Sequence, residues 1–133
     1  MIRSLRIAAA ALAAAGMVSA PMACFSDRTS GPAVDLEGCN VELPSEAFGS
    51  SIVVIRDFAF TPALVTVKPG SKVTWVNCET PGSESHTSTA DAGAWNSPLL
   101  APGATFTRQF DAVGPFAYHC TPHPGMTGSV RVE

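Results

Sequence analysis

Near the end of the 133-residue chain, a thiol, an imidazole and a thioether follow one another at three-residue intervals, as Cys120, His123 and Met126. Soft sulfur ligands hold reduced copper and imidazole nitrogens hold oxidised copper, and a set of two His, one Cys and a distant axial Met provides both. Pro122 and Pro124 fix their own φ angles and so stiffen the segment. The segment therefore predicts three of the four ligands of a copper site.

The chain has three histidines, so the fourth ligand must be either His86 or His119. His119 directly precedes Cys120 in a predicted strand, so its side chain points to the face opposite the thiol. We therefore predict that His86 is the fourth ligand. We expect His119 to be a partly exposed histidine without a metal-binding role.

The spacing of Cys120 and His123 also occurs in zinc sites. A structural zinc ion in an exported protein would need further thiolates, however, and methionine is the wrong ligand for it. A purely structural interpretation, with Cys120 in a disulfide and Met126 in the core, explains each residue alone but not the four together. Copper oxidases and nitrite reductases need additional histidines, and a binuclear copper centre needs two cysteines on this segment. We therefore expect no catalytic residues.

Strand-sized runs of β-branched and aromatic residues begin at Ser51. Pro-Gly and Gly-Pro pairs separate them, at spacings too short for crossover helices. Apolar and polar residues alternate in 72–77 and 105–110, which indicates one buried face. We predict an all-β, antiparallel sandwich, with 83–100 as a loop holding at most one short strand. The predicted strands are residues 51–57, 64–67, 72–77, 104–110, 114–119 and 126–132.

Three regions are predicted along the chain. Residues 1–23 are interpreted as a signal peptide, because two arginines precede an apolar run at 7–18 and small residues follow it. That run is too short for a membrane-spanning helix. Residues 24–50 are rich in Ser, Gly, Pro, Asp and Glu and are predicted to be a flexible extension. Residues 51–133 are the predicted folded domain of a periplasmic or extracellular protein.

The charge balance limits the kinds of partner. Arg3 and Arg6 would leave with the signal peptide, whereas all eleven acidic residues would stay. The negative charge that results argues against nucleic acid or anionic lipid as a partner. It is compatible with a basic protein partner.

From about Ile52 to Glu133 the sequence resembles the cupredoxins, or blue copper proteins, in their plastocyanin and azurin-like group and most closely in the amicyanin type. The motif around Cys120 is very specific, because the short interval between His123 and Met126 is the amicyanin-like form. In chain order the matching features are Asp57-Phe58-Ala59-Phe60-x-Pro62, Val67-x-Pro69-Gly70-x-x-Val73-x-Trp75-x-Asn77, His86, and Tyr118-His119-Cys120-Thr121-Pro122-His123-Pro124-x-Met126-x-Gly128.

The resemblance implies a Greek-key β-sandwich of about eight strands, with one copper ion between the His86 loop and the loop from Cys120 to Met126. It also implies that His123 shows its ring edge in an apolar patch where redox proteins dock. Amicyanin-like proteins usually carry Asn where this chain has Thr87. Asn77, Thr87 and Thr121 are expected to surround the ligands without binding the metal.

The other cysteines are Cys24, Cys39 and Cys78. Ala23-Cys24 resembles the junction of a bacterial lipoprotein, and both lipid attachment at Cys24 and an unmodified thiol are left open. If Cys24 carries a lipid, Cys39 and Cys78 remain to form a disulfide between the extension and the copper end. If it does not, one thiol is left over. We predict the Cys39 to Cys78 pairing.

These features together predict a monomeric type 1 copper protein that passes single electrons between redox partners outside the cytoplasm. The alternative is a copper carrier or buffer without an electron-transfer role. A closed set of four ligands in a stiff loop favours retention of the metal. Carriers more often use exposed Met-rich or His-rich stretches, which the sequence lacks.

Overall fold

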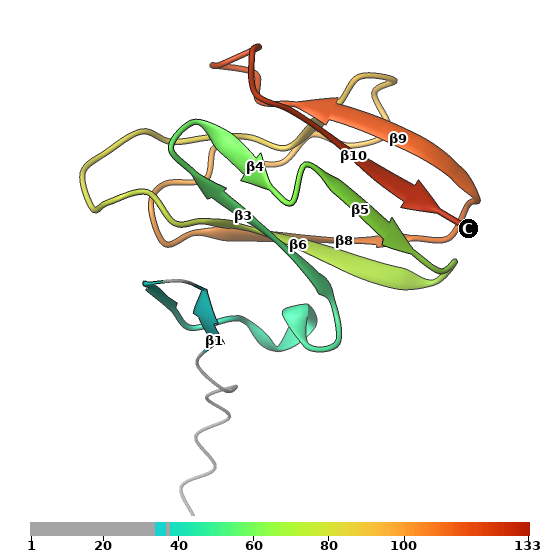
Figure 1. The fold of residues 1–133 in the computed structure, drawn as a ribbon, viewed down its shortest axis with the longest axis horizontal. Coiled ribbons are helices and arrows are strands. Elements are labelled where there is room, and N and C mark those ends of the chain that lie inside the picture. Colours follow the sequence, from blue (N-terminus) through green and yellow to red (C-terminus); the bar gives the residue numbers. More distant parts are fainter. Residues whose placement is uncertain (1–33, 37) are drawn as a thin grey trace, which may run out of the picture.

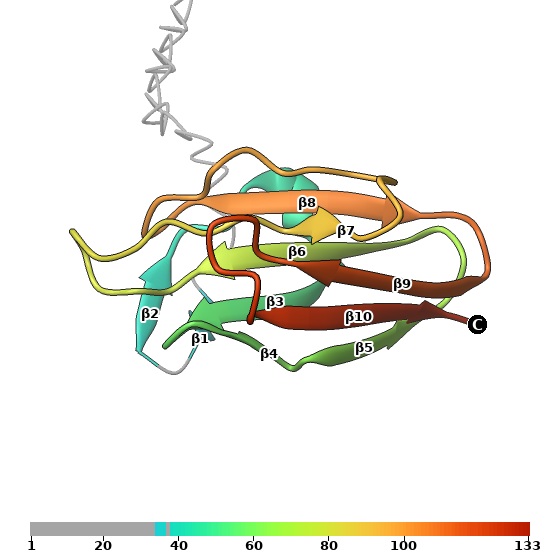
Figure 2. The same cartoon turned by 90° about the horizontal axis from the view of Figure 1, so that it is seen from above.

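A computed structural model describes residues 34–36 and 38–133, and in it two four-stranded sheets stack face to face (Figure 1, Figure 2). The predicted all-β sandwich of about eight strands is confirmed. The first sheet has the order β4-β3-β6-β8, from β3 (Ser51–Arg56), β4 (Ala59–Thr61), β6 (Ser71–Asn77) and β8 (Thr105–Phe110). The second has the order β5-β10-β9-β7, from β5 (Leu64–Val67), β7 (Thr89–Ala90), β9 (Gly114–His119) and β10 (Thr127–Val132).

The pairing within the sheets is mixed, which corrects the expectation of purely antiparallel strands. β3 pairs with β6 in parallel, and β5 pairs with β10 in parallel, whereas the other neighbours are antiparallel. The chain leaves the first sheet after β4, adds β5 to the second sheet and then returns as β6 beside β3. β6 therefore reaches its place beside β3 by way of the second sheet and not through a hairpin, and it runs in the same direction as β3.

Two of the eight strands in these two sheets were not among the predicted runs, although the short β7 lies in the loop at 83–100 for which one short strand was allowed. β4 has three residues and follows β3 after only two, and β7 has two residues. Neither is long enough to show the alternation of apolar and polar residues that identifies a strand. The other six strands of the two sheets differ from the predicted runs by no more than one residue at either end.

Aromatic side chains fill the space between the sheets. Trp75 of β6 and Tyr118 of β9 are fully buried, and their rings meet edge to face with centroids 5.3 Å apart. Trp95 and Phe110 lie against this pair. Each such aromatic contact contributes about 0.5–1.5 kcal/mol beyond the burial of area. The core therefore fixes β9, and with it the start of the loop that follows His119.

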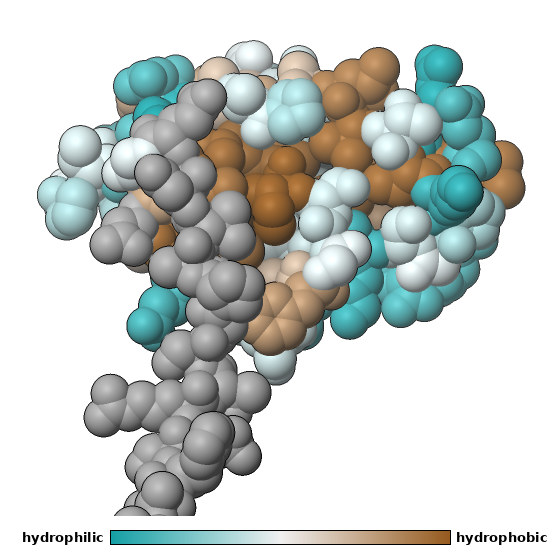
Figure 3. All heavy atoms as spheres, turned by 60° about the horizontal axis from the view of Figure 1, so that its bottom comes forward, coloured by the Kyte–Doolittle hydropathy of each residue, from teal (hydrophilic) through white to brown (hydrophobic). Residues whose placement is uncertain are grey.

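The outer face of the first sheet is covered by residues before Ser51, where the sequence predicted no regular element. They form β1 (Val34–Leu36), β2 (Cys39–Val41) and the 3-10 turn η1 (Ser45–Ala47). Leu43 and Ala47 are buried against Val76, which explains why residues 73–77 of β6 are all buried instead of alternating. Hydrophobic side chains gather in the middle of this side of the molecule (Figure 3).

A disulfide joins Cys39 of β2 to Cys78, as predicted. The two cysteines are 39 residues apart in sequence, with their Cα atoms 5.3 Å apart. Closing a loop of this length restricts the unfolded chain and contributes about 4 kcal/mol on the chain-entropy account. The disulfide thus fixes the extension to the residue that follows β6.

The predicted signal peptide and Cys24 lie outside the described residues. Within the part of the chain that is described, no helix is long and apolar enough to cross a membrane.

Gly128 of β10 lies directly opposite Tyr118 of β9, whose ring covers it. A Cβ atom at Gly128 would lie 2.8 Å from Tyr118 Cε2 and closer still to Cζ and Oη. We expect Gly128→Ala to lower the free energy of unfolding by about 1–3 kcal/mol, because the buried ring has no room to move. Urea denaturation measures this change. Gly125→Ala is the matched control, since its Cβ would meet nothing within 4 Å, and equal stabilities for the two variants would contradict the prediction.

Candidate metal centre

Two loops bring three metal-binding side chains together at the end of the sandwich away from the C-terminus (Figure 1). His86 lies in the loop between β6 and β7. Cys120 directly follows β9, and His123 lies in the turn between β9 and β10. His86 and Cys120 are fully buried, whereas His123 is partly exposed. The structure thus brings together the side-chain donor atoms of three of the four predicted ligands.

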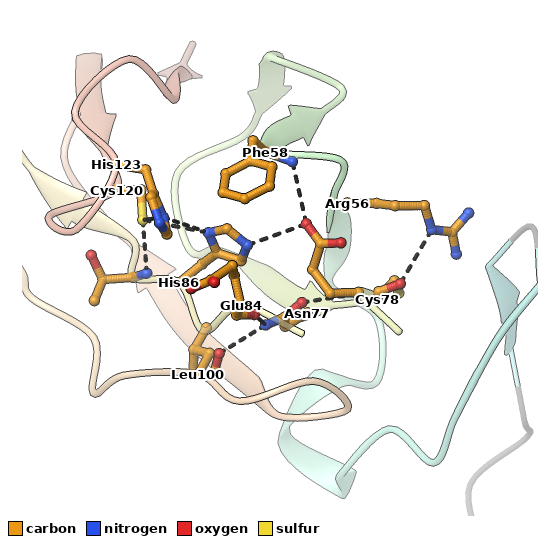
Figure 4. Close-up of polar contacts among 11 residues, drawn as sticks. Arg56, Phe58, Asn77, Cys78, Glu84, His86, Leu100, Cys120 and His123 are labelled. Atoms are coloured by element: carbon orange, nitrogen blue, oxygen red, sulfur yellow. Dashed lines mark hydrogen bonds and ion pairs between the residues drawn. The ribbon is translucent and has the colours of Figure 1, made fainter. Parts of the chain in front are cut away.

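The three donor atoms face one another (Figure 4). Cys120 Sγ is 3.7 Å from His86 Nδ1 and 3.6 Å from His123 Nδ1, and the two Nδ1 atoms are 3.2 Å apart. Metal bonds of about 2.0–2.3 Å to nitrogen and sulfur would separate the donors of a trigonal set by roughly 3.5–3.7 Å. The arrangement therefore fits one metal ion between the three atoms.

Met126 closes the same loop through its backbone. Its N–H donates to His123 O at 2.9 Å, and its carbonyl accepts the Cys120 N–H at 3.0 Å. The side chain is buried in the same cluster as Cys120. The axial role of its thioether stays a prediction.

His119 takes no part in this group. Its Nδ1 lies 2.6 Å from Asp91 Oδ1 on the opposite face of β9, where both side chains are partly exposed. This is the orientation expected from the alternation of side chains along a strand.

Asn77 fixes the loop that carries His86. Its fully buried side-chain amide donates from Nδ2 to Leu100 O at 2.8 Å and to Glu84 O at 3.1 Å. Leu100 in turn exchanges two backbone hydrogen bonds with His86, at 2.8 and 3.0 Å. Asn77 therefore bonds to both sides of the loop that carries His86.

Glu79 is a residue of the site that the sequence did not indicate. Its Oε1 lies 3.3 Å from His86 Nε2, and its side chain is only 8% exposed. Its backbone N–H donates to Asn77 Oδ1 at 3.0 Å. Burial lowers the pKa of His86 below its ordinary value, and the hydrogen bond to Glu79 partly opposes this shift. A carboxylate that accepts the Nε2 proton leaves Nδ1 of the neutral imidazole as the atom that can bind a metal.

Threonines join the two loops. Thr87 N donates to Cys120 Sγ at 3.3 Å, and Thr87 Oγ1 accepts the Thr121 N–H at 2.8 Å. Thr89 Oγ1 lies 3.0 Å from Thr87 Oγ1 and 2.9 Å from Thr121 Oγ1. Amicyanin-like proteins usually carry Asn at position 87. Here the hydroxyl of Thr87 forms the hydrogen bond to the opposite loop.

The types of donor atom in the site favour copper over zinc. Zinc sites made of cysteines need several thiolates, but Cys39 and Cys78 are oxidised to a disulfide, and Cys120 is the one free cysteine in the described part of the chain. One thiolate and two imidazoles in a buried site, beside a buried methionine, suit copper in both of its common oxidation states. The residues present therefore fit a copper ion.

We expect Thr87→Val to remove the acceptor of the Thr121 N–H and to loosen the contact between the loops. The free energy of unfolding should fall by about 0.5–1.5 kcal/mol, the contribution of one such hydrogen bond. Thr87→Ser keeps the hydroxyl and should behave like the unsubstituted chain. Urea denaturation and the visible spectrum of the copper-loaded protein are the measurements, and a Val variant with unchanged stability and spectrum would show that this hydrogen bond is dispensable.

Comparison with known proteins agrees with this geometry. Residues 50–133 match the family described as copper-binding proteins of the plastocyanin/azurin family. Amicyanin-alpha of Methylorubrum extorquens is 35% identical over 117 residues, which cover 86% of this chain and 95% of that protein. Amicyanin of Paracoccus denitrificans is 34% identical over 89 residues, which cover 65% of this chain and 68% of that protein.

Solved structures show the same likeness. A reduced variant of amicyanin superposes with a TM-score of 0.60 at 30% identity, covering 68% of this chain and 95% of its own. The cofactor of the family is a single copper ion. The chain therefore belongs to the plastocyanin/azurin family of copper-binding proteins, the cupredoxins.

Proposed function

We propose that the chain is a type 1 copper protein that carries single electrons between redox proteins outside the cytoplasm. The observation that carries this proposal is the convergence of His86 Nδ1, Cys120 Sγ and His123 Nδ1 in a site of which only His123 reaches the surface. The buried Cys120 and His86 would hold the metal, and the partly exposed His123 would connect it to the surface. This arrangement suits the passage of an electron better than the binding of a substrate.

His86, Cys120 and His123 are the proposed equatorial ligands, and Met126 is the proposed axial ligand. Copper bound there supplies a reversible one-electron couple. The chain itself keeps the donors in place. The hydrogen bonds of Thr87 join the two loops, and Asn77 and Glu79 fix His86. These contacts hold the donor atoms in place, so a bound copper ion would meet similar donors in both oxidation states and little rearrangement would accompany the electron.

The proposed exit for the electron is the ring of His123. This side chain lies in a turn closed by hydrogen bonds from His123 N to Cys120 O and from Met126 N to His123 O. Pro122 and Pro124 on either side are exposed, and so is Leu99, at 62%. A weakly polar surface around a metal-binding histidine suits brief contacts with a redox protein.

A copper carrier or buffer is the second candidate function. Release of the ion would have to separate the two loops and expose Cys120 and His86, which are fully buried. The hydrogen bonds between the loops oppose that opening. An enzyme with a second copper site would need further histidines, and the sequence offers only His119. Electron transfer is therefore the function that the geometry favours, and an enzyme activity is not part of the proposal.

The proposal includes export and a monomeric protein. Residues 1–23 are the proposed signal peptide and residues 24–50 the extension that precedes the cupredoxin domain at 51–133. The disulfide between Cys39 and Cys78 supports a periplasmic or extracellular location, because such bonds persist in oxidising compartments. Cys24 remains a candidate for lipid attachment.

We expect the oxidised, copper-loaded protein to be intensely blue, because a thiolate bound to oxidised copper in a trigonal site absorbs strongly by charge transfer. Cys120→Ser should abolish the colour. Met126→Gln is the matched change at the axial position, and it should keep the copper and the colour while lowering the reduction potential. Absorption spectra, metal analysis and voltammetry measure these properties. A colourless chain that takes up zinc and refuses copper would sink the proposal.

We expect Pro124→Glu to slow electron self-exchange without changing the visible spectrum, because two like charges would then meet when two copies approach through His123. Val113→Glu is the control, since Val113 is 71% exposed at the opposite end of β9. The self-exchange rate follows from NMR line broadening in mixtures of oxidised and reduced protein. A rate that is unaffected by Pro124→Glu would place the exit elsewhere. A negligible rate in the unsubstituted protein, with rapid loss of copper to a chelator, would favour the carrier.

A further inference from the structure

Cys78 lies between the two residues that hold the loop of His86. Asn77 precedes it and donates to two carbonyl groups of that loop, and Glu79 follows it and contacts His86 Nε2 at 3.3 Å (Figure 4). The backbone of Cys78 is itself bonded on both sides. Its N–H donates to a carbonyl of β3 at 2.8 Å, and its own carbonyl accepts from Arg56 Nε at 3.3 Å. A shift of Cys78 would therefore displace both residues that hold the loop.

The extension before Ser51 bears on this same short segment. Its apolar side chains form one buried cluster with Val76 and Cys78. The guanidinium of Arg56 adds a second connection besides the disulfide, because Nη2 donates to Leu36 O at 3.2 Å while Nε bonds Cys78 O. This cluster is separate from the core between the two sheets. The extension can therefore loosen while the sandwich stays folded.

The disulfide lies beside a cavity of about 510 Å³ between the extension and the end of β6. Cys39 and Cys78 both line this cavity, and they are 6% and 8% exposed. Thr80 and Pro81 line it as well, and both are exposed, so the cavity opens at the surface. Glu79, which contacts His86, is a further lining residue. A small thiol that enters from solvent would thus meet the disulfide close to the residues that hold His86.

We propose that Cys39 and Cys78 form a site of thiol–disulfide exchange that controls how firmly the copper site retains its metal. The reactant is a dithiol or a disulfide of the kind carried by thiol oxidoreductases. With the disulfide formed, the extension holds residues 77–79 and, through them, His86. With two thiols in its place, the extension separates from Cys78, the His86 loop opens more often and copper is lost faster. The inference rests on the proposed copper function and adds a control to the same site.

The exchange proceeds in two steps. In the reducing direction, a thiolate of the dithiol attacks one sulfur of the pair, the bond between Cys39 and Cys78 breaks, and a mixed disulfide forms. The other cysteine leaves as a thiolate and takes up a proton. The second thiolate of the reactant then attacks the mixed disulfide, which releases the remaining cysteine and leaves the reactant as a disulfide. Two electrons pass from the dithiol to the pair, and the two protons of the dithiol end on the two cysteines. Oxidation is the reverse.

The first experiment compares the unsubstituted chain with the double variant Cys39→Ala, Cys78→Ala, which represents the reduced state. Copper(I)-loaded protein is mixed with bathocuproine disulfonate, and the coloured copper complex is followed with time. We expect the double variant to lose copper about tenfold faster, within the range of about 5- to 150-fold that is typical of coupling between two sites. The His86 N–H, which donates to Leu100 O at 3.0 Å, should exchange with solvent faster by a similar factor in the copper-free variant. Hydrogen exchange followed by NMR measures this.

Two control variants separate the latch from general instability. Leu43→Ala weakens the packing of the extension but keeps the disulfide, and Val132→Ala weakens the core at the far end of β10. Both should unfold at lower urea concentrations and yet lose copper as slowly as the unsubstituted chain. Equally fast copper loss from Val132→Ala would overturn the proposal. A double variant in which the N–H groups between β9 and β10 also lose their protection would overturn it too, because the disulfide would then hold the whole domain.

The second experiment tests whether a thiol reaches the disulfide in the folded chain. The copper-free protein is treated with dithiothreitol at several urea concentrations below the unfolding transition, and alkylation with mass spectrometry counts the thiols at Cys39 and Cys78. Reduction through the cavity should proceed at a rate that hardly depends on urea, since local access exposes little additional surface. A rate that is negligible without urea and rises steeply with it would mean that the domain must unfold first, which would contradict an exchange site.

The outcomes also distinguish the two proposals. A blue chain whose copper loss and His86 exchange are the same with and without the disulfide would overturn the latch and leave the copper function standing. A chain that never turns blue with copper would overturn the proposed function. In that chain, the exchange of the His86 N–H and the reduction by dithiothreitol would still show whether the disulfide controls the loop.

Discussion

The two hydrogen bonds of Thr87 join the only two segments that carry the proposed equatorial ligands. Thr87 N donates to Cys120 Sγ, and Thr87 Oγ1 accepts from Thr121 N, so one residue bonds to the opposite loop through both its backbone and its side chain. A hydrogen bond between the hydroxyls of Thr89 and Thr121 adds a third contact between the same two segments. The rest of the structure positions the two loops so that these short bonds can form. The stacked sheets provide the frame, since β6 leads into one loop and β9 into the other.

Three consecutive residues, beginning with the last residue of β6, have separate structural roles. Asn77 fixes the loop around His86, Cys78 joins the extension through the disulfide, and Glu79 contacts both His86 and the turn at Phe58. The extension is therefore tied to the site through the disulfide and the backbone of residues 77–79. A contribution of about 4 kcal/mol from the disulfide is a large share of the 5–15 kcal/mol typical of a domain's stability. The stability of the extension and the geometry of His86 are thus linked through the backbone of residues 77–79.

How much of the fold and the site could be predicted from the sequence depends on how far apart the interacting residues lie in the chain. Cys120, His123 and Met126 lie on one short segment, so their chemistry is visible in the sequence. His86 could be inferred because few histidines compete with it. Glu79 could not, because its contact with His86 depends on how the intervening loop folds. The parallel pairing of β3 with β6 was missed for a related reason, since the path of the chain between the two sheets leaves no local pattern. The Asp57-Phe58 turn lacks the Asn-Gly signal of a hairpin, so the sequence predicted a strand through residue 57 and missed β4.

The Asp57-Phe58 turn and the partly exposed His123 meet the same physical requirement. A site that holds a thiolate and an imidazole without solvent must be closed, yet a site that exchanges electrons must lie close to the surface. Burial of Cys120 and His86 meets the first condition, and the partial exposure of His123 meets the second. The ring of Phe58 serves both, because one part covers the two imidazoles while another part faces solvent. A glycine in this turn would relieve the backbone but leave the imidazoles uncovered. The positive φ angles of 51° at Asp57 and 57° at Phe58 therefore accompany a large apolar side chain in the β3 to β4 turn, beside the two imidazoles.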